Sequence, residues 1–254
     1  RIATSPLRTG DVIVNIADET PTLIPERNSP VDIWIACGSM DGSISLWQVG
    51  ADTKRSKLVQ CVQPDASQDS SNTVGHTSTV RAMVWSRHNG NDVLISGSFD
   101  HQIVVWRLTS NNQLDRHITL GGKHGAHDGA VTALACIDDV SIASIVSAGE
   151  DGVVKLWDLD APTHPTRAIQ LRGKGVCSLA WLPNPVKSDD DKGGWLACGM
   201  GDNSIVVCEP ETGKQVATMR GHSGAVHTLL WLETKGWLVS GSSDATVRTW
   251  RVRS

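Results

Sequence analysis

The chain has 254 residues, enough for one all-β domain with a large buried core. Its net charge of −4 provides no basic footprint for nucleic acid or an anionic membrane, and no apolar run is long enough to span a bilayer. The chain does not open with the charged and apolar regions of a secretory signal, so we expect an intracellular protein, cytoplasmic or nuclear.

One short block of sequence recurs five times. Its copies are CGSMDGSISLW (37–47), SGSFDHQIVVW (96–106), SAGEDGVVKLW (147–157), CGMGDNSIVVC (198–208) and SGSSDATVRTW (240–250). In each copy an Asp stands six residues before the closing Trp, or before Cys208 in the fourth copy, and successive Asp residues lie 59, 51, 51 and 42 apart. This period is typical of four-stranded propeller blades with a few long loops, and not of helical solenoids.

A His precedes three of the copies at a regular distance. Gly75-His76 stands 30 residues before Trp106, Ala126-His127 stands 30 before Trp157, and Gly221-His222 stands 28 before Trp250. Together these motifs resemble the WD-repeat family over roughly residues 9 to 253. The resemblance implies an all-β fold, a β-propeller of four-stranded antiparallel blades with five WD repeats.

The first predicted element is residues 9–16. Their sequence, TGDVIVNI, parallels TGKQVATM at 212–219, which is typical of the outermost strand of a blade. Only four residues follow Trp250, so we expect 9–16 to complete the last blade and close the ring. We therefore predict a single domain over 1–254, with blades at about 17–62, 74–121, 125–172, 173–220 and 221–253 plus 9–16.

The blades differ in regularity. In the first, Leu23-Ile24-Pro25 is a weak candidate for the innermost strand, and Asp18 stands near the place where a His is expected. The second is the most regular and predicts strands at 79–85, 92–98, 102–108 and 116–120, called a to d from the axis outward. Residues 63–73 and 183–194 are polar insertions that we interpret as solvated loops.

Ser, His and Asp recur together, which could indicate a hydrolase triad. A catalytic site is needed once, however, and this set appears three times at matching spacing. The resemblance implies a structural hydrogen-bonded tetrad in each of three blades, which pins the turn between strands b and c to the loop before strand a. The tetrads are His76, Ser96, Asp100 and Trp106; His127, Ser147, Asp151 and Trp157; and His222, Ser240, Asp244 and Trp250.

No cofactor or metal site is expected. The six Cys show no paired metal spacing, and the HxxH pair of His124 and His127 has only Asp128 as a further ligand nearby. Cys37 and Cys198 take a Ser position of the repeated block and Cys136 takes a Trp position, so we expect small buried thiols in a reducing compartment.

We expect the protein to be a non-catalytic scaffold, a subunit of a complex that binds other proteins or peptides. The resemblance places the contact residues on the top face, where the b–c turns and the loops before strand a lie. We expect them to be Phe99, Arg81, Glu150, Thr132, His227 and Met40.

Two alternatives stay open. One is a substrate-receptor or regulatory propeller of a ubiquitin ligase or another enzyme, for which Trp157-Asp158 and Trp250-Arg251 each match half of a Trp-Asp-x-Arg motif. The other is a component of an RNA-processing or other nucleic-acid-associated assembly. The net charge counts against direct nucleic-acid binding, although Lys54, Arg55 and Lys57 form a local basic group.

Overall fold

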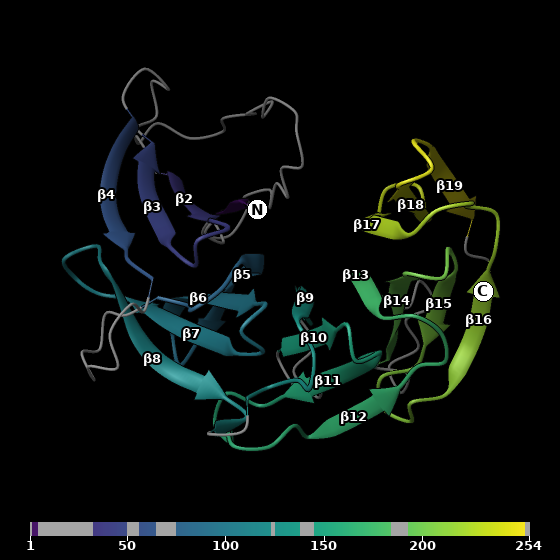
Figure 1. Ribbon diagram of the computed structural model, residues 1–254, viewed down its shortest axis with the longest axis horizontal. Helices are drawn as coiled ribbons and strands as arrows, with labels where there is room; N and C mark the ends of the chain where they lie inside the picture. The colour runs from purple at the N-terminus through teal and green to yellow at the C-terminus, as the bar shows by residue number, and fades with distance from the viewer. Residues whose placement is uncertain are drawn as a thin grey trace. The chain divides into compact units, whose positions relative to one another are not determined.

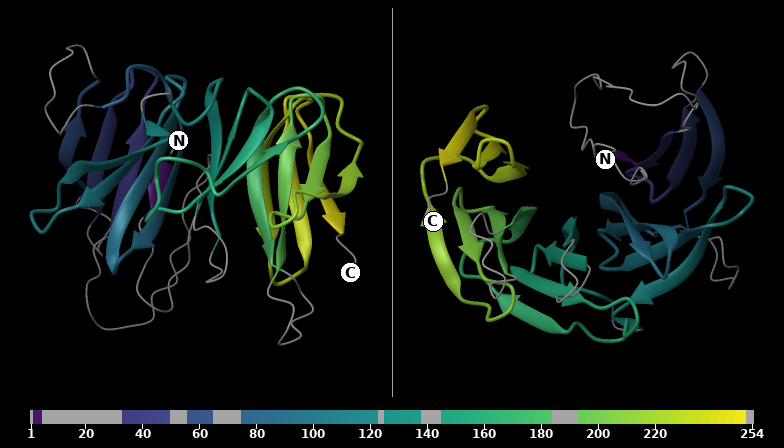
Figure 2. Two further views of the ribbon diagram at one scale, coloured as in Figure 1. Left: turned by 90° about the horizontal axis from the view of Figure 1, so that it is seen from below. Right: turned by 180° about the vertical axis from the view of Figure 1, so that it is seen from behind.

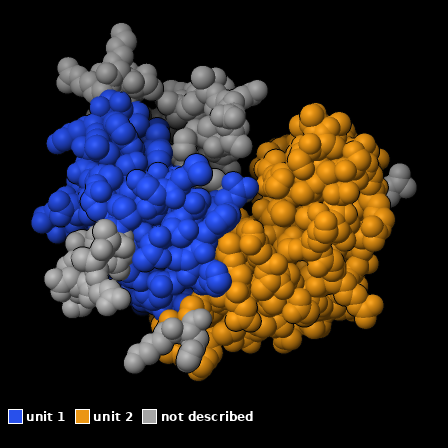
Figure 3. Space-filling model, viewed as in Figure 1, with its two compact units in different colours: residues 1–120 blue, residues 121–254 orange. Residues whose placement is uncertain are grey.

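The computed structural model describes residues 2–4, 33–49, 56–64, 75–122, 125–137, 145–183 and 193–251. These residues form nineteen β-strands in five antiparallel sheets. The chain divides into two compact units, residues 1–120 and 121–254, which Figure 3 shows in different colours. Each unit is described by itself.

The first unit contains two four-stranded sheets, labelled in Figure 1. One has the order β1 (Ile2–Thr4), β2 (Ile33–Gly38), β3 (Ile44–Val49) and β4 (Ser56–Val62). The other has the order β5 (Val80–His88), β6 (Asn91–Ser98), β7 (Ile103–Leu108) and β8 (Leu114–Leu120). Strands that are consecutive in sequence are neighbours in each sheet.

The second unit contains three sheets. The first consists of β9 (Val131–Cys136), β10 (Ile145–Gly149), β11 (Val153–Trp157) and β12 (Arg167–Gln170). The second consists of β13 (Val176–Pro183), β14 (Gly194–Met200), β15 (Ile205–Cys208) and β16 (Gln215–Met219). The third has three strands among the described residues, β17 (Val226–Leu232), β18 (Trp237–Ser242) and β19 (Val247–Arg251).

Alternating side chains fix how the sheets pack within a unit. In the first unit, Ala36, Ile44 and Leu46 form one face of the β1–β4 sheet and pack with Trp106 and Leu94 of the β5–β8 sheet. Within the second unit, the β13–β16 and β17–β19 sheets lie side by side, as the further views in Figure 2 also show. The face of the β5–β8 sheet that carries Trp106 packs on the β1–β4 sheet, and the face of the β17–β19 sheet that carries Trp250 packs on the β13–β16 sheet. Each contact buries apolar rows of both sheets.

The second blade matches its sequence prediction closely. Strands predicted at 79–85, 92–98, 102–108 and 116–120 correspond to β5, β6, β7 and β8. The expected all-β fold of four-stranded antiparallel blades is confirmed.

The first blade differs from its prediction. The strand next to β2 on its free side is Ile2–Thr4, in the register Ile2 with Cys37 and Thr4 with Ile35. The inner strand that we expected at 23–25 and the closing strand at 9–16 lie outside the described residues. Ring closure and a single domain over 1–254 therefore stay predictions.

The prediction of small buried thiols is correct for Cys198 and wrong for two other positions. Cys198 is fully buried, whereas Cys37 and Cys136 are half-buried. Cys37 lies on the face of β2 opposite to the one that packs on the β5–β8 sheet, and Cys136 is the last residue of β9. Each position is therefore covered only in part.

Candidate functional site

All five turns between strands b and c have the same local structure. The Asp carboxylate accepts a hydrogen bond from the N–H two residues later, over 2.9 to 3.1 Å, in every copy. The residue just after the Asp has a positive φ in every copy: Gly42 at 91°, His101 at 69°, Gly152 at 73°, Asn203 at 73° and Ala245 at 62°. This is an Asx-type turn, in which the Asp side chain and not the next residue's identity sets the backbone conformation.

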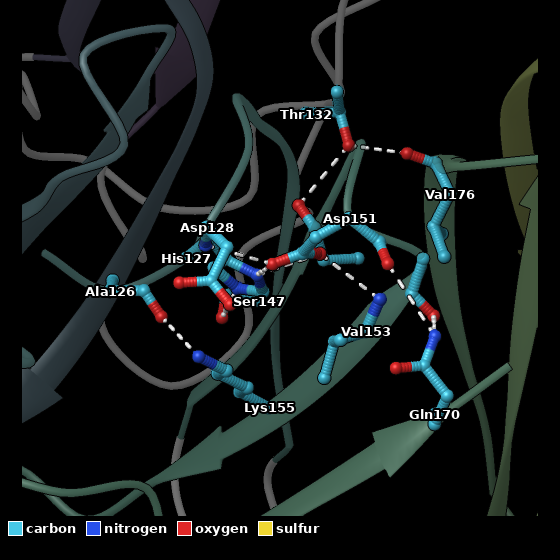
Figure 4. Close-up of polar contacts among 12 residues, drawn as sticks. Ala126, His127, Asp128, Thr132, Ser147, Asp151, Val153, Lys155, Gln170 and Val176 are labelled. Carbon is cyan, nitrogen blue, oxygen red and sulfur yellow. Dashed lines mark hydrogen bonds and ion pairs between the residues drawn. The ribbon is translucent and has the colours of Figure 1, made fainter.

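In three blades the same Asp also meets a buried His. Figure 4 shows the arrangement in the β9–β12 sheet, where His127 Nδ1 lies 2.9 Å from Asp151 Oδ2 and its Nε2 lies 2.7 Å from Ser147 Oγ. The Trp157 indole N–H donates to the same Ser147 oxygen over 2.8 Å. His127 comes from the loop before β9, so these bonds hold that loop against the turn between β10 and β11.

The other two tetrads have almost the same geometry. His76 lies 2.8 Å from Asp100 and 2.7 Å from Ser96, and Trp106 lies 2.8 Å from Ser96. In the last sheet the corresponding distances among His222, Asp244, Ser240 and Trp250 are 2.8, 2.7 and 2.8 Å. The structure thus brings together all twelve residues that the resemblance assigned to tetrads.

One arrangement of protons satisfies every polar atom of a tetrad. The Trp N–H donates to the Ser oxygen, the Ser hydroxyl donates to His Nε2, and His Nδ1–H donates to the Asp carboxylate. In this assignment the His is neutral and the Asp is charged. Because all three Ser side chains are completely buried, their hydroxyls are committed to this network and do not face solvent.

The networks lower the pKa values of their carboxyl groups. Burial by itself raises the pKa of Asp100 and Asp151, but hydrogen bonds from the His and from two backbone N–H groups outweigh it and hold each pKa below its ordinary value. Hydrogen bonds led by that of Thr246 also lower the pKa of Asp244. These Asp residues are therefore anionic at neutral pH.

The β13–β16 sheet has a different interior at this place. Arg172 stands four residues before Val176, the position that His holds before Val80, Val131 and Val226, and it is exposed. Cys198 and Cys208 take the places of Ser and Trp, and both are buried. The hydrogen bond with Cys208, together with burial, raises the pKa of the Cys198 thiol. In this turn the Asp202 carboxylate accepts hydrogen bonds from the backbone N–H and the hydroxyl of Ser204.

Two of the expected contact residues, Met40 and Phe99, lie close together in the first unit. The Thr79 hydroxyl donates to the Met40 carbonyl over 3.0 Å, and the Phe99 N–H donates to the Thr79 carbonyl over 2.9 Å. This link brings the turns of two neighbouring sheets to one surface, where Met40 is 84% exposed and Phe99 is 40% exposed. Arg81, two residues after Thr79, is half-buried.

In the second unit, two expected contact residues are accessible and one is not. Glu150 and His227 are exposed, and the Glu150 N–H donates to the Ala130 carbonyl over 2.9 Å. Thr132 is only 7% exposed, so its assignment as a contact residue is wrong. Its hydroxyl lies within hydrogen-bond distance of the carbonyls of Ala148 and Val176, and it joins β9 to β10 and β13 (Figure 4).

Metal-binding groups and membrane-spanning helices are both absent from the described residues. Within the described ranges, no group of three or more His, Cys, Asp or Glu side chains is arranged to hold a metal ion, although His124 lies outside them. None of the described residues belongs to a helix with the length and hydropathy of a membrane span.

Comparison with known proteins agrees with this geometry. The chain is similar to Elongator complex protein 2 of Danio rerio, with 30% identity over 194 residues, which cover 70% of this chain and 22% of the relative. It is also similar to the small ribosomal subunit protein RACK1y of Oryza sativa subsp. japonica, with 28% identity over 186 residues, 70% of this chain and 49% of the relative. The chain therefore spans about half or less of the length of these relatives.

The fold also matches a solved structure. A chain in a crystal structure of the mitotic checkpoint complex aligns with a TM-score of 0.64 and 24% identity, over 87% of this chain and 58% of that chain, which shows the shared fold. The family model described as "WD domain, G-beta repeat" matches residues 27–48, 68–107, 119–158 and 213–251, more than half of the sequence. With three complete His/Ser/Asp/Trp tetrads and five alike turns, the chain belongs to the WD40 family.

Proposed function

We propose that the protein is a non-catalytic scaffold that binds another protein within an intracellular complex. The contact is made by the Met40–Phe99 surface, which we define as Met40, Thr79, Arg81 and Phe99. One observation carries the proposal: two large apolar side chains are exposed on turns whose backbones are fixed by hydrogen bonds to the same Thr79.

Rigid turns make these exposed side chains effective in binding. The Phe99 turn is held by the Asp100 tetrad and by the N–H bond to Thr79, and the Met40 turn is held by Asp41 and by the Thr79 hydroxyl. A partner would therefore pay little to order the backbone there. Aromatic, Met and Arg side chains are enriched at protein interfaces, and Arg81 adds a cation that can pair with a carboxylate.

The buried state of the three Ser side chains supports the absence of catalysis. A hydrolase nucleophile must reach a substrate carbonyl. Ser96, Ser147 and Ser240 are each fully buried and each accepts a hydrogen bond from Trp. The His residues that would act as bases, His76, His127 and His222, are likewise at most 7% exposed, so neither base nor nucleophile faces a substrate.

The names of the relatives support the proposal that this protein is a subunit of an assembly. Two of them are named as components of larger assemblies, the Elongator complex and the small ribosomal subunit. The matching fold in the mitotic checkpoint complex is likewise that of one chain among several. We propose an intracellular location on the same grounds, with binding to proteins rather than to nucleic acid because the net charge is −4.

The test compares partners of variants in affinity purification with quantitative mass spectrometry. Phe99→Ala and Arg81→Ala should each weaken binding of the specific partner by about 1–3 kcal/mol, and the melting temperature should change little. Val216→Ser is the matched control, because Val216 is 50% exposed but lies on β16, away from the turns.

A second control alters a segment that is not part of the proposed contact surface. Changing Asp189, Asp190 and Asp191 to Asn alters the 183–194 insertion and should leave the partner bound. If partner binding survives both turn substitutions but is lost when the insertion is altered, the Met40–Phe99 surface is not the contact site.

A further inference from the structure

The hairpin that joins β5 to β6 in the first unit has a two-residue turn, Asn89-Gly90. His88 and Asn91 form the last pair of the two strands, and the φ angles of Asn89 and Gly90 are both positive, at 49° and 77°. Asn followed by Gly is the sequence that such a turn favours. This is the one Asn-Gly dipeptide in the whole sequence, and both of its residues are exposed.

An Asn side chain can react with the main-chain nitrogen of the residue that follows it. That nitrogen loses its proton to water or hydroxide, attacks the carboxamide carbon Cγ and closes a five-membered succinimide ring, while the bond from Cγ to Nδ2 breaks and ammonia leaves. Water then opens the ring at one of its two carbonyls. The product is either Asp or an isoaspartyl residue, in which the main chain runs through Cγ. The reaction consumes one water molecule, releases one ammonia and needs no oxidant or cofactor.

The turn leaves the nitrogen of Gly90 available for this attack. Pairing in the hairpin stops at His88 and Asn91, so the Gly90 N–H lies outside the ladder. Among the hydrogen bonds of the described residues, none has this N–H as its donor. Gly90 has no side chain to obstruct the ring, and a Cβ placed on it would have no atom within 4 Å. The attacking atom therefore has no bond to break first and has room to move.

Two other Asn residues in turns share the left-handed backbone but not the free nitrogen. The φ angle is 60° at Asn112 and 73° at Asn203. The N–H after Asn112 donates to the Thr109 hydroxyl over 3.1 Å, and the N–H after Asn203 donates to the Asp202 carboxylate over 3.1 Å. Each of these nitrogens must give up a hydrogen bond before it can attack.

The groups around Asn89 also favour the reaction and determine its consequence. Asn89 Nδ2 lies 3.1 Å from His88 Nε2, so the departing nitrogen has a titratable ring within reach for proton exchange. Arg87 and Asp92 form an exposed ion pair of 3.0 Å beside the turn. Because these two charges balance each other, a new carboxylate at position 89 adds a net negative charge to the end of the hairpin.

We propose that Asn89 is a site of spontaneous modification, at which the folded protein forms a succinimide with the Gly90 nitrogen and converts to aspartyl and isoaspartyl forms. Both products carry the additional negative charge. The isoaspartyl form also adds one carbon to the main chain of a two-residue turn, so we expect it to disturb the His88–Asn91 pair at the end of the strands. The proposal is independent of the contact surface proposed above.

Peptide mapping of the intact, folded protein after timed incubation in mildly alkaline buffer tests the proposal. Trypsin cuts after Arg87 and Arg107, so one peptide, 88–107, carries Asn89, and fragmentation in the mass spectrometer locates the change. Asn89 should convert about tenfold or more faster than Asn112 or Asn203, which are matched controls within the same chain. A sample digested without incubation corrects for conversion during the digest.

Two variants identify the chemistry. Asn89→Gln adds one methylene, so attack by the Gly90 nitrogen would have to close a six-membered ring, and both the mass change and the gain of charge on ion-exchange chromatography should disappear. Asn89→Asp provides the aspartyl product as a standard, and a second product of the same mass that elutes apart from it is the isoaspartyl form. Circular dichroism checks that both variants fold.

Three results would overturn the proposal. One is conversion of Asn112 or Asn203 in the folded protein as fast as that of Asn89. Another is a gain of charge that persists in Asn89→Gln. The third is conversion of Asn89 only in urea, with the folded protein left intact, which would mean that the turn holds the Asn89 side chain away from the Gly90 nitrogen.

Discussion

Removing the tetrad carboxylates should destabilise the protein by different amounts in different blades. The Asp100 carboxylate accepts hydrogen bonds from His76 Nδ1 at 2.8 Å and from the N–H groups of Thr77 and Gln102, both at 3.0 Å. Thr77 is exposed, so water can replace the carboxylate there. His76 is 1% exposed and Gln102 is half-buried, so in Asp100→Ala their donors lose a charged acceptor without ready access to water.

The magnitude follows from these two donors. A hydrogen bond to a charged group contributes about 1.5–3 kcal/mol to stability, and a buried unsatisfied donor costs about 1–3 kcal/mol. Since the two effects overlap, we expect Asp100→Ala to lower the free energy of unfolding by roughly 2–3 kcal/mol, and Asp151→Ala to do the same. Asp202→Ala removes only the contacts with Ser204 and should cost about 0.5–1 kcal/mol.

Urea denaturation followed by circular dichroism measures all three variants. The slope of the free energy with urea should stay the same, which indicates that the same surface is exposed on unfolding. A double-mutant cycle adds a check: once His76→Ala has removed the donor, Asp100→Ala should cost less than it does in the wild type. Equal losses at Asp100, Asp151 and Asp202 would refute the assignment of the first two to a special network.

Two further predictions concern acid stability and ring closure. The folded-state pKa values of Asp100 and Asp151 lie below their ordinary values, so below about pH 4 the unfolded chain binds more protons than the folded chain. The free energy of unfolding should therefore fall as the pH drops through that range. In the Asp100→Ala variant this fall should be shallower, and an identical dependence of the free energy on pH in wild type and variant would contradict the prediction. Deletion of residues 1–16 should lower the melting temperature measured by calorimetry, since it removes both β1 and the predicted closing strand 9–16; a truncated protein that melts like the parent would exclude closure by that strand.

The regular blades could be predicted from sequence because several independent signals coincide there. In the second blade, the His76 position, the Val80 start of strand a, the Asp100 turn and the closing Trp106 all have fixed spacing. The same spacing predicted which residues meet in the tetrads, and the structure brings them within hydrogen-bond distance. Because the same spacing recurs in three blades, the tetrad assigned in each blade supports the tetrads assigned in the other two.

Other features have no local signal. A three-residue strand such as Ile2–Thr4 is too short for a recognisable alternation, and its place beside β2 depends on pairing between residues 31 to 35 positions apart. Thr132 looks like any polar residue beside a strand start, and its burial arises from the proximity of β13. The exposure of Val247 is likewise invisible in a sequence that repeats the buried Ile205 at the same register.

The residue after each turn Asp has a left-handed backbone conformation, and this affects how the repeats can diverge in sequence. Five copies of one turn contain Gly, His, Gly, Asn and Ala at this position, although a left-handed backbone costs a non-glycine residue about 1–2 kcal/mol. The Asp side chain holds the backbone of this turn in place, so His, Asn and Ala are found there besides Gly, although a Cβ at Gly42 would clash with the carbonyl oxygen of His76. Duplicated blades can therefore diverge at this turn where the position is exposed, as at His101 and Ala245, and acquire new surface chemistry there while the frame beneath stays the same.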